Sequence, residues 1–429
     1  MTLSIAGSIV GSWDGRRRAD GRSRMDATLG DPAMQLASRM SSIGTETAFE
    51  AAARARALEA TGRSVIHLEI GEPDFDTPAN IREAAKRAID TGKTHYPPFP
   101  GIPELRSAIA ADSALRRGFA PDPANVYVTV GGKGVMYYAI LALVDPGDEV
   151  IVPDPGYPIY ESVTRFVGGT PVAIPIRQEN EFRLDPDELA SLVTPRTKLI
   201  VINSPANPTG GVLTRGDLER IAAIAIEHDL AVLSDEIYSR ILYDGAEHVS
   251  IAALPGMAER TIVLDGFSKT WAMTGWRLGY GIVPSWMGHG FGRLLINSVS
   301  GATTFAQWGA VEAIAGPQDE VDAMLREFQA RRDLVVVGLN AIPGMTCLRP
   351  AGAFYVFPEI SGTGLTGAEL ADRLLNEAGV SVLAGTAFGD VGRNHIRLSY
   401  ATSRENISAA LERIAGVVAP LVATGAAAR

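Results

Sequence analysis

Cysteine is almost absent from this chain: Cys347 is the only one among 429 residues. A single cysteine excludes an intramolecular disulfide and a cysteine-rich metal site, and it is typical of proteins of the reducing cytoplasm. The six histidines show no metal-ligand spacing, so no metal is expected. No apolar run reaches the roughly eighteen residues of a membrane span. The formal net charge of −10 argues against nonspecific binding to nucleic acid or to anionic membranes.

The length of the chain exceeds what one hydrophobic core usually supports, so we expect two domains. Residues 1–33 contain a short apolar stretch that is followed by arginines, the reverse of a signal peptide, and we expect a disordered extension there. Residues 34–77 are expected to pack with a small domain formed mainly by residues 321–429. Residues 78–320 are expected to form a large domain.

Strand-length apolar runs alternate with amphipathic helical segments through the large domain. This alternation predicts an α/β fold with a mostly parallel sheet that is flanked by helices. After about residue 320 the pattern changes to a long charged helix and short strands, which predicts a smaller α+β domain. The clearest predicted elements are the strands Asn125–Val130, Glu149–Val152, Leu199–Ile202 and Ala231–Leu233, and the helices Val135–Leu143, Asp217–His228 and Val321–Asn340.

Lys269 directly follows another predicted strand, which begins at Thr261. A lysine at the end of a buried strand loses hydration, so its pKa falls and its neutral amine can attack a carbonyl group. Pyridoxal phosphate (PLP) is the commonest aldehyde bound in this way. A lone lysine beyond a strand is more often a surface residue. The interpretation therefore depends on the residues that accompany Lys269.

Polar residues also follow the two preceding strands: Asn207 lies in the loop after the first, and Asp235 follows the second. Ligands of open parallel sheets bind at the carboxyl ends of the strands, where these side chains should meet. The Asp235 carboxylate could keep the pyridine nitrogen of PLP protonated, which makes the ring an electron sink. The Asn207 amide and the Tyr238 hydroxyl could hold the phenolic oxygen as an anion.

A phosphate group needs backbone N–H groups and a fixed cation. Gly132 and Lys133 at the start of a predicted helix could supply the first, and Arg277 the second. Tyr157, in a loop after a strand, could stack on the pyridine face. Each residue also has an ordinary interpretation: Tyr157 as a core aromatic, Asn207 as a turn residue, and Arg397 as a salt-bridged strand residue.

From about Glu46 to its C-terminus the chain resembles the class I/II aminotransferases of the fold-type I PLP enzymes, particularly the aspartate-aminotransferase-like subgroup of bacteria and archaea. The motifs that carry the resemblance are Gly71-Glu-Pro-Asp-Phe-Asp-Thr-Pro78, Tyr96-Pro-Pro-Phe-Pro-Gly-Ile-Pro-Glu-Leu-Arg106, Asn207-Pro-Thr-Gly210, Ser268-Lys269 and Gly275-Trp-Arg277.

By this resemblance Lys269 is the residue that forms the Schiff base with PLP, and Asp235 is the partner of the ring nitrogen. Arg397 matches the arginine that binds the substrate α-carboxylate, and Gly71 a backbone contact on its other side. Tyr96 matches a tyrosine that reaches the phosphate of the neighbouring subunit, so the resemblance implies a homodimer.

The chain departs from the family pattern just before the lysine. Relatives often have Ser-x-Ser-Lys, whereas this chain has Gly266-Phe-Ser-Lys269. One phosphate-binding hydroxyl is therefore missing, and Ser268, Arg277 and the turn at residues 131–133 must carry more of the phosphate binding.

The activity that these residues predict is amino transfer between an amino acid and a 2-oxo acid, with Lys269 as the base that moves the Cα proton. A β-eliminating C–S lyase is an alternative, because it begins with the same cofactor. A PLP-sensing transcription regulator is a third possibility, but it needs an N-terminal DNA-binding domain, and residues 1–33 are too few for one.

Lys133 favours aspartate- or glutamate-like donors, because in acidic-substrate members of the subgroup a lysine here meets the distal carboxylate. Prephenate is also a possible substrate. Glu50, in the segment that covers the site in relatives, could instead repel an acidic side chain or attract a basic one. Val380-Ser-Val-Leu-Ala-Gly385 is similar to arginine- and aromatic-acting relatives, so an aminotransferase for those donors is an alternative.

Overall fold

A seven-stranded sheet forms the centre of the protein in the computed structural model, which describes residues 35–427. The strand order is β2-β8-β7-β6-β5-β3-β4, and only β8 runs antiparallel to its neighbours. The predicted α/β fold with a mostly parallel sheet is confirmed. The strands are β2 (Val126–Val130), β3 (Glu149–Asp154), β4 (Thr170–Pro175), β5 (Thr197–Asn203), β6 (Ala231–Asp235), β7 (Thr261–Gly266) and β8 (Leu278–Ile282).

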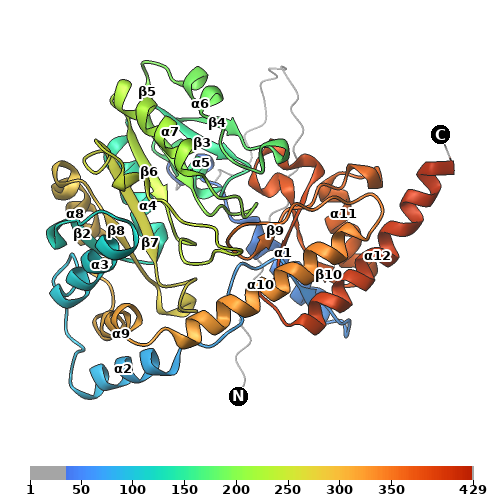
Figure 1. The fold of residues 1–429 in the computed structure, drawn as a ribbon, viewed down its shortest axis with the longest axis horizontal. Helices are drawn as coiled ribbons and strands as arrows, with labels where there is room; N and C mark the ends of the chain where they lie inside the picture. Colours follow the sequence, from blue (N-terminus) through green and yellow to red (C-terminus); the bar gives the residue numbers. More distant parts are fainter. Residues whose placement is uncertain (1–34, 428–429) are drawn as a thin grey trace, which may run out of the picture. The chain divides into compact units, whose positions relative to one another are not determined.

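Helices cover both faces of this sheet (Figure 1). Successive residues of a strand point to opposite faces, so Leu199 and Val201 of β5 pack in one cluster and Ile200 and Ile202 in another. Because both faces are buried, the strand reads as a continuous apolar run. One face packs against α4 (Gly132–Leu143), α5 (Ile159–Phe166) and α8 (Ser285–Val299). The other packs against α3 (Pro103–Arg116), α6 (Pro186–Leu192), α7 (Arg215–Glu227) and α9 (Thr304–Ala315).

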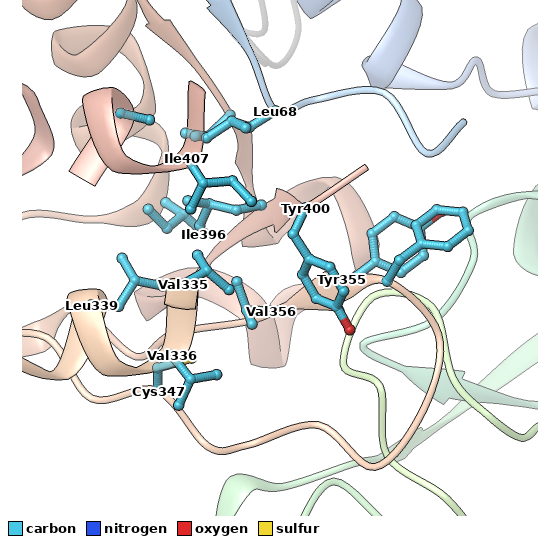
Figure 2. Packing of buried hydrophobic residues seen from close by; sticks show 14 of the residues in the cluster. Leu68, Val335, Val336, Leu339, Cys347, Tyr355, Val356, Ile396, Tyr400 and Ile407 are labelled. Carbon is cyan, nitrogen blue, oxygen red and sulfur yellow. The ribbon is translucent and has the colours of Figure 1, made fainter. Parts of the chain in front are cut away.

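A separate hydrophobic cluster lies beside the sheet and includes residues from near both ends of the described chain (Figure 2). Leu68 meets residues of the long helix α10, such as Val335, and of the C-terminal segments, such as Ile396 and Ile407. Its elements include β1 (Ile66–His67), α10 (Asp319–Asn340), β9 (Tyr355–Val356), α11 (Gly367–Arg373), β10 (Val380–Ser381), β12 (Ile396–Ser399) and α12 (Arg404–Ala427). The strand β11 (Leu383–Ala384) pairs with β12.

This clustering accords with a small α+β region, while the exact bounds 34–77, 78–320 and 321–429 remain a prediction. Two further helices are α1 (Thr47–Glu59) and α2 (Ala79–Asp90). The extension predicted at residues 1–33 lies outside the described residues. No helix of the described part is long and apolar enough to cross a membrane.

Candidate active site

A cavity of about 480 Å³ opens at the carboxyl ends of β5, β6 and β7. Its volume falls within the usual range for small-molecule sites. Every residue that the sequence predicted for the site lines it, except Tyr96, whose side chain is exposed. The lining includes Gly71, Gly132, Lys133, Tyr157, Asn207, Asp235, Tyr238, Ser268, Lys269, Arg277 and Arg397.

Lys269 follows β7, whose residues are buried throughout. Its Nζ donates a hydrogen bond to the carbonyl oxygen of Gly71. Burial, together with the positive charges of Arg397 and Arg277, lowers the pKa of Lys269 to about 8, against the opposing charge of Glu72. A neutral amine is therefore available near pH 8, which is what a nucleophile or a base requires.

Asp235 ends β6 and is 5% exposed. Its Oδ2 accepts a hydrogen bond of 2.7 Å from the Tyr160 hydroxyl, and its Oδ1 accepts one of 3.2 Å from the Ile237 N–H. Burial raises the pKa of Asp235 to about 6. Both hydrogen-bond donors are neutral, so neither of them cancels the negative charge of the carboxylate. A protonated ring nitrogen in the cavity could therefore form an ion pair with Asp235.

Arg397, on β12, is 3% exposed and lies with its guanidinium 4.5 Å from the ring centroid of Tyr355. Its Nη1 donates to Oδ1 of Asn207 at 3.1 Å, and its Nη2 donates to the carbonyl oxygen of Glu69. The buried Nε has no hydrogen-bond partner among residues 35–427. A buried guanidinium with an unused donor that lines a cavity suits the binding of a carboxylate.

Gly131, just before α4, contacts Arg277 so closely that only glycine fits. A Cβ at this position would lie 2.5 Å from Nη2 of Arg277, and Gly131 has a φ of 70°. The Gly131 N–H donates to the carbonyl oxygen of Arg277 at 3.0 Å, which fixes the arginine at the first turn of α4. Backbone N–H groups at a helix start beside a guanidinium form an anion site, and Ser268 also faces this cavity.

Tyrosine hydroxyls and asparagine amides line another part of the cavity, beside Asn207. The Tyr238 and Tyr355 hydroxyls lie 2.7 Å apart, and Tyr157 lines the same space. Asn203 accepts a hydrogen bond of 2.8 Å from the Asn207 N–H, which holds the Asn207 loop against the end of β5.

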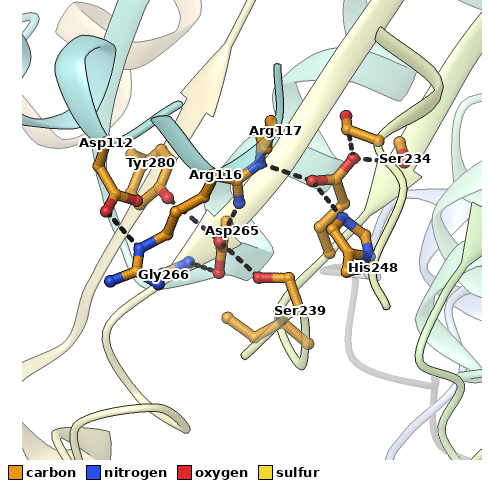
Figure 3. A network of polar contacts seen from close by, with 12 residues as sticks. Asp112, Arg116, Arg117, Ser234, Ser239, His248, Asp265, Gly266 and Tyr280 are labelled. Atoms are coloured by element: carbon orange, nitrogen blue, oxygen red, sulfur yellow. Dashed lines mark hydrogen bonds and ion pairs between the residues drawn. The ribbon is translucent and has the colours of Figure 1, made fainter. Parts of the chain in front are cut away.

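A buried ionic network is centred on Arg117 and includes Asp265 and His248 (Figure 3). Arg117, which follows α3, donates to Oε2 of Glu236 at 2.6 Å and also to Oδ2 of Asp265. Glu236 directly follows Asp235, the last residue of β6, and Asp265 lies on β7. Arg117 therefore links the end of β6 to the neighbouring strand β7, which precedes Lys269. His248 lies 3.0 Å from Glu236, and the Tyr280 hydroxyl donates to Asp265 at 3.1 Å.

Sequence reasoning missed several lining residues. Tyr160, Asn203 and Tyr355 were not singled out, because a buried tyrosine or asparagine has no distinctive local pattern. For the acidic residue of the N-terminal segment we expected Glu50, but the structure places Glu46 in the cavity. Glu50 is exposed and accepts a hydrogen bond of 2.8 Å from the Thr45 hydroxyl.

The cavity therefore offers an amine, a buried carboxylate, an anion site and a guanidinium, and these fit the ring, phosphate and substrate carboxylate of a PLP site. The fold and the site together define a fold-type I enzyme, the class in which a strand-end lysine holds this cofactor.

Comparisons with known proteins specify the family. Residues 63–414 match the model of the aminotransferase class I and II family, and the chain belongs to this family. It is 45% identical to an aspartate aminotransferase of Pyrococcus abyssi over 83% of this chain and 92% of that protein. It is 44% identical to an aromatic-amino-acid aminotransferase of Thermococcus litoralis over 82% and 92%. The solved Thermus thermophilus aspartate aminotransferase with maleate has a TM-score of 0.86 and 41% identity, covering 90% of this chain and all of that one.

Proposed function

We propose that the protein is a PLP-dependent aminotransferase that moves the amino group of an aspartate- or glutamate-like donor to a 2-oxo acid. The observation that carries this proposal is the Lys269 amine, with a pKa of about 8, in the same cavity as the buried Asp235 and the buried Arg397. The acidic donor class is supported by the aspartate-acting relative and by Lys133, a cation in the cavity wall.

Residues from several parts of the cavity wall would hold the cofactor. Asp235 would hold the ring nitrogen, Asn207 and Tyr238 the phenolic oxygen, and Tyr157 a face of the ring. The backbone N–H groups of Gly132 and Lys133, with the side chains of Ser268 and Arg277, would hold the phosphate. When bound, PLP supplies the electron sink that weakens the Cα–H bond of an amino acid.

The chain's own groups then handle the substrate and its proton. The planar fork of Arg397 binds the α-carboxylate in two-point contact and so fixes where Cα lies. Lys269, as a neutral amine, takes the proton from Cα of the amino donor. In the second half of the reaction it gives a proton to Cα of the amino acid that forms from the 2-oxo acid. In the structure the Lys269 amine donates a hydrogen bond to the carbonyl oxygen of Gly71.

We also infer that two copies of the chain pair, with Tyr96 of each reaching the other's phosphate site. The Tyr96 side chain is 91% exposed. Its loop is held against the segment after α8, where the Thr304 hydroxyl donates to the His95 carbonyl at 2.6 Å. Exposed Ile296 and Val299 of α8 provide further apolar surface for a partner. A cytoplasmic location stays a prediction from composition.

The test of the activity is a panel of amino donors with 2-oxoglutarate and pyruvate as acceptors, followed by borohydride reduction and peptide mapping. We expect acidic donors to give the highest kcat/KM and the reduced pyridoxyl group to sit on Lys269. Lys269→Ala should abolish amino transfer, because the attachment point and the base are lost together. A pyridoxyl group on another lysine, or oxo-acid formation that needs no acceptor, would contradict the proposal.

A further inference from the structure

Lys133, the cation expected to receive an acidic side chain, already has a carboxylate partner within the chain. Its Nζ donates to Oε1 of Glu46, a residue that is distant in sequence and immediately precedes α1. The Lys133 side chain is 40% exposed and that of Glu46 is 17% exposed. Both residues line the cavity with Lys269 and Arg397. The charge that an acidic donor requires is therefore neutralised before any donor arrives.

Three features favour displacement of the Glu46 side chain, whose carboxylate also interacts with the Tyr157 hydroxyl. As the residue that precedes α1, it makes no side-chain capping hydrogen bond to the helix. The only fully buried residues of α1 are Ala52 and Ala55, and in its first turn only the partly buried Ala48 packs against the core. Phe49, in that turn, also lines the cavity and is 61% exposed. A segment with so few buried contacts shifts at low cost.

Lys133 has a second neighbour that an uncharged donor could use. Its Nζ lies 5.9 Å from the ring centroid of Tyr157. While Glu46 neutralises the ammonium, this wall of the cavity presents an ion pair without net charge together with an aromatic ring. An apolar or aromatic side chain can pack there without leaving a charge unpaired, which would otherwise be costly.

We propose that Glu46 is a specificity-determining residue that occupies the place of a donor's side-chain carboxylate. An acidic donor replaces Glu46 on Lys133, whereas an uncharged donor leaves the Glu46–Lys133 pair intact and packs against it and Tyr157. The site then serves two donor classes with one set of reacting groups. This inference rests on the proposed function, because it assumes that amino acids bind between Lys269 and Arg397.

The decisive variant is Glu46→Gln, which keeps the shape of the side chain and removes its charge. Glu50→Gln is the matched control, because Glu50 is a nearby carboxylate that lies outside the cavity lining. kcat/KM is measured with aspartate, phenylalanine and arginine as donors. Binding of two non-reactive acids, maleate and 3-phenylpropionate, to the PLP-loaded enzyme is measured by calorimetry.

We expect Glu46→Gln to raise kcat/KM for aspartate and the affinity for maleate by about fivefold, since partly exposed ion pairs contribute up to about 1 kcal/mol. The values for phenylalanine and 3-phenylpropionate should change by less than about twofold, because these compounds do not compete for Lys133. Glu50→Gln should change nothing. In a Lys133→Ser background Glu46→Gln should have no effect on aspartate, since no ammonium remains to be released.

Equal changes for aspartate and phenylalanine, or no change for either, would overturn the role of Glu46. A selective loss with arginine would also overturn it, and would make Glu46 the receptor of a cationic side chain. Lys133→Ser distinguishes the acidic donor class from the role of Glu46. If it weakens aspartate and maleate while Glu46→Gln alters neither, the acidic donor class stands and the inference falls. If wild type transfers no amino group, the proposed function falls, while maleate binding still tests the competition at Lys133.

Discussion

Asp235 is the residue whose environment most clearly suits one chemical task. It is a buried carboxylate whose pKa burial raises, and its two hydrogen bonds come from neutral groups. Such a site disfavours a lone negative charge and favours an ion pair with a positive group that enters the cavity. The ring nitrogen of PLP is a group of this kind.

Asp235→Ala should reduce kcat by more than tenfold, or more than about 1.4 kcal/mol of transition-state stabilisation, because a neutral pyridine is a poor electron sink. Cofactor affinity should fall much less, since the phosphate contacts remain. Steady-state kinetics at saturating PLP and a fluorescence titration of PLP separate the two quantities. Tyr160→Phe, which removes one hydrogen bond to Asp235, should have an intermediate effect. An Asp235→Ala variant that retains more than a tenth of kcat would contradict the assignment.

Residues with a distinctive neighbourhood could be predicted from the sequence, and those without one could not. Lys269, Asp235 and Asn207 each follow a recognisable buried strand, so their meeting at one edge of the sheet was expected. Tyr160 and Tyr355 lie among other apolar residues, and their polar ends face the cavity only because of tertiary packing. Glu46 and Glu50 lie in the same short segment of the sequence, and only the tertiary structure shows that Glu46 is the one that lines the cavity.

At the scale of elements, β6 and β7 are joined twice, once by their backbone ladder and once by Arg117. The side chains of Arg117 and Glu236 are almost fully buried, at 3% and 1% exposure. Removing one partner from such a pair leaves a buried charge without compensation.

Arg117→Met should therefore lower the free energy of unfolding by about 3–5 kcal/mol, measured by urea denaturation. Arg116→Met is the matched control, because Arg116 is the adjacent arginine and pairs with Asp112 at 41% exposure in an i,i+4 contact on the helix. That substitution should cost less than about 1 kcal/mol. Similar losses for the two variants would show that the network does not stabilise the fold in this way.

The periodicity of the sequence predicted β3, β5, β6 and β7 but not the direction of β8. Strand direction is set by the connection between strands, and the short segment from Gly266 to Leu278 returns the chain beside β7 in the opposite sense. Apolar alternation is the same in both directions. Of the short strands predicted after residue 320, β9 comprises only Tyr355–Val356.

For the whole molecule, the exposed Tyr96 is the one predicted site residue that its own cavity does not contain. A homodimer with shared sites explains this, and subunit complementation tests it. Co-expressed Lys269→Ala and Tyr96→Ala chains should form mixed dimers in which one of the two sites has both residues intact. Such dimers, isolated with two different tags, should have about half the activity of wild-type dimers. Activity no higher than that of either parent variant would place Tyr96 outside the partner's site.

The first turn of α1 contributes Ala48 and Phe49 to the cavity wall, and none of its residues is fully buried. Asp235, Lys269 and Arg397 come from strands or strand ends that are fixed by the core, and substitutions there endanger folding and chemistry together. Substitutions at residues 46–50 alter the surroundings of the donor side chain and leave the core unchanged. The donor specificity of this enzyme can thus change through substitutions at residues 46–50, in evolution or in laboratory selection, while the residues that perform the reaction stay the same.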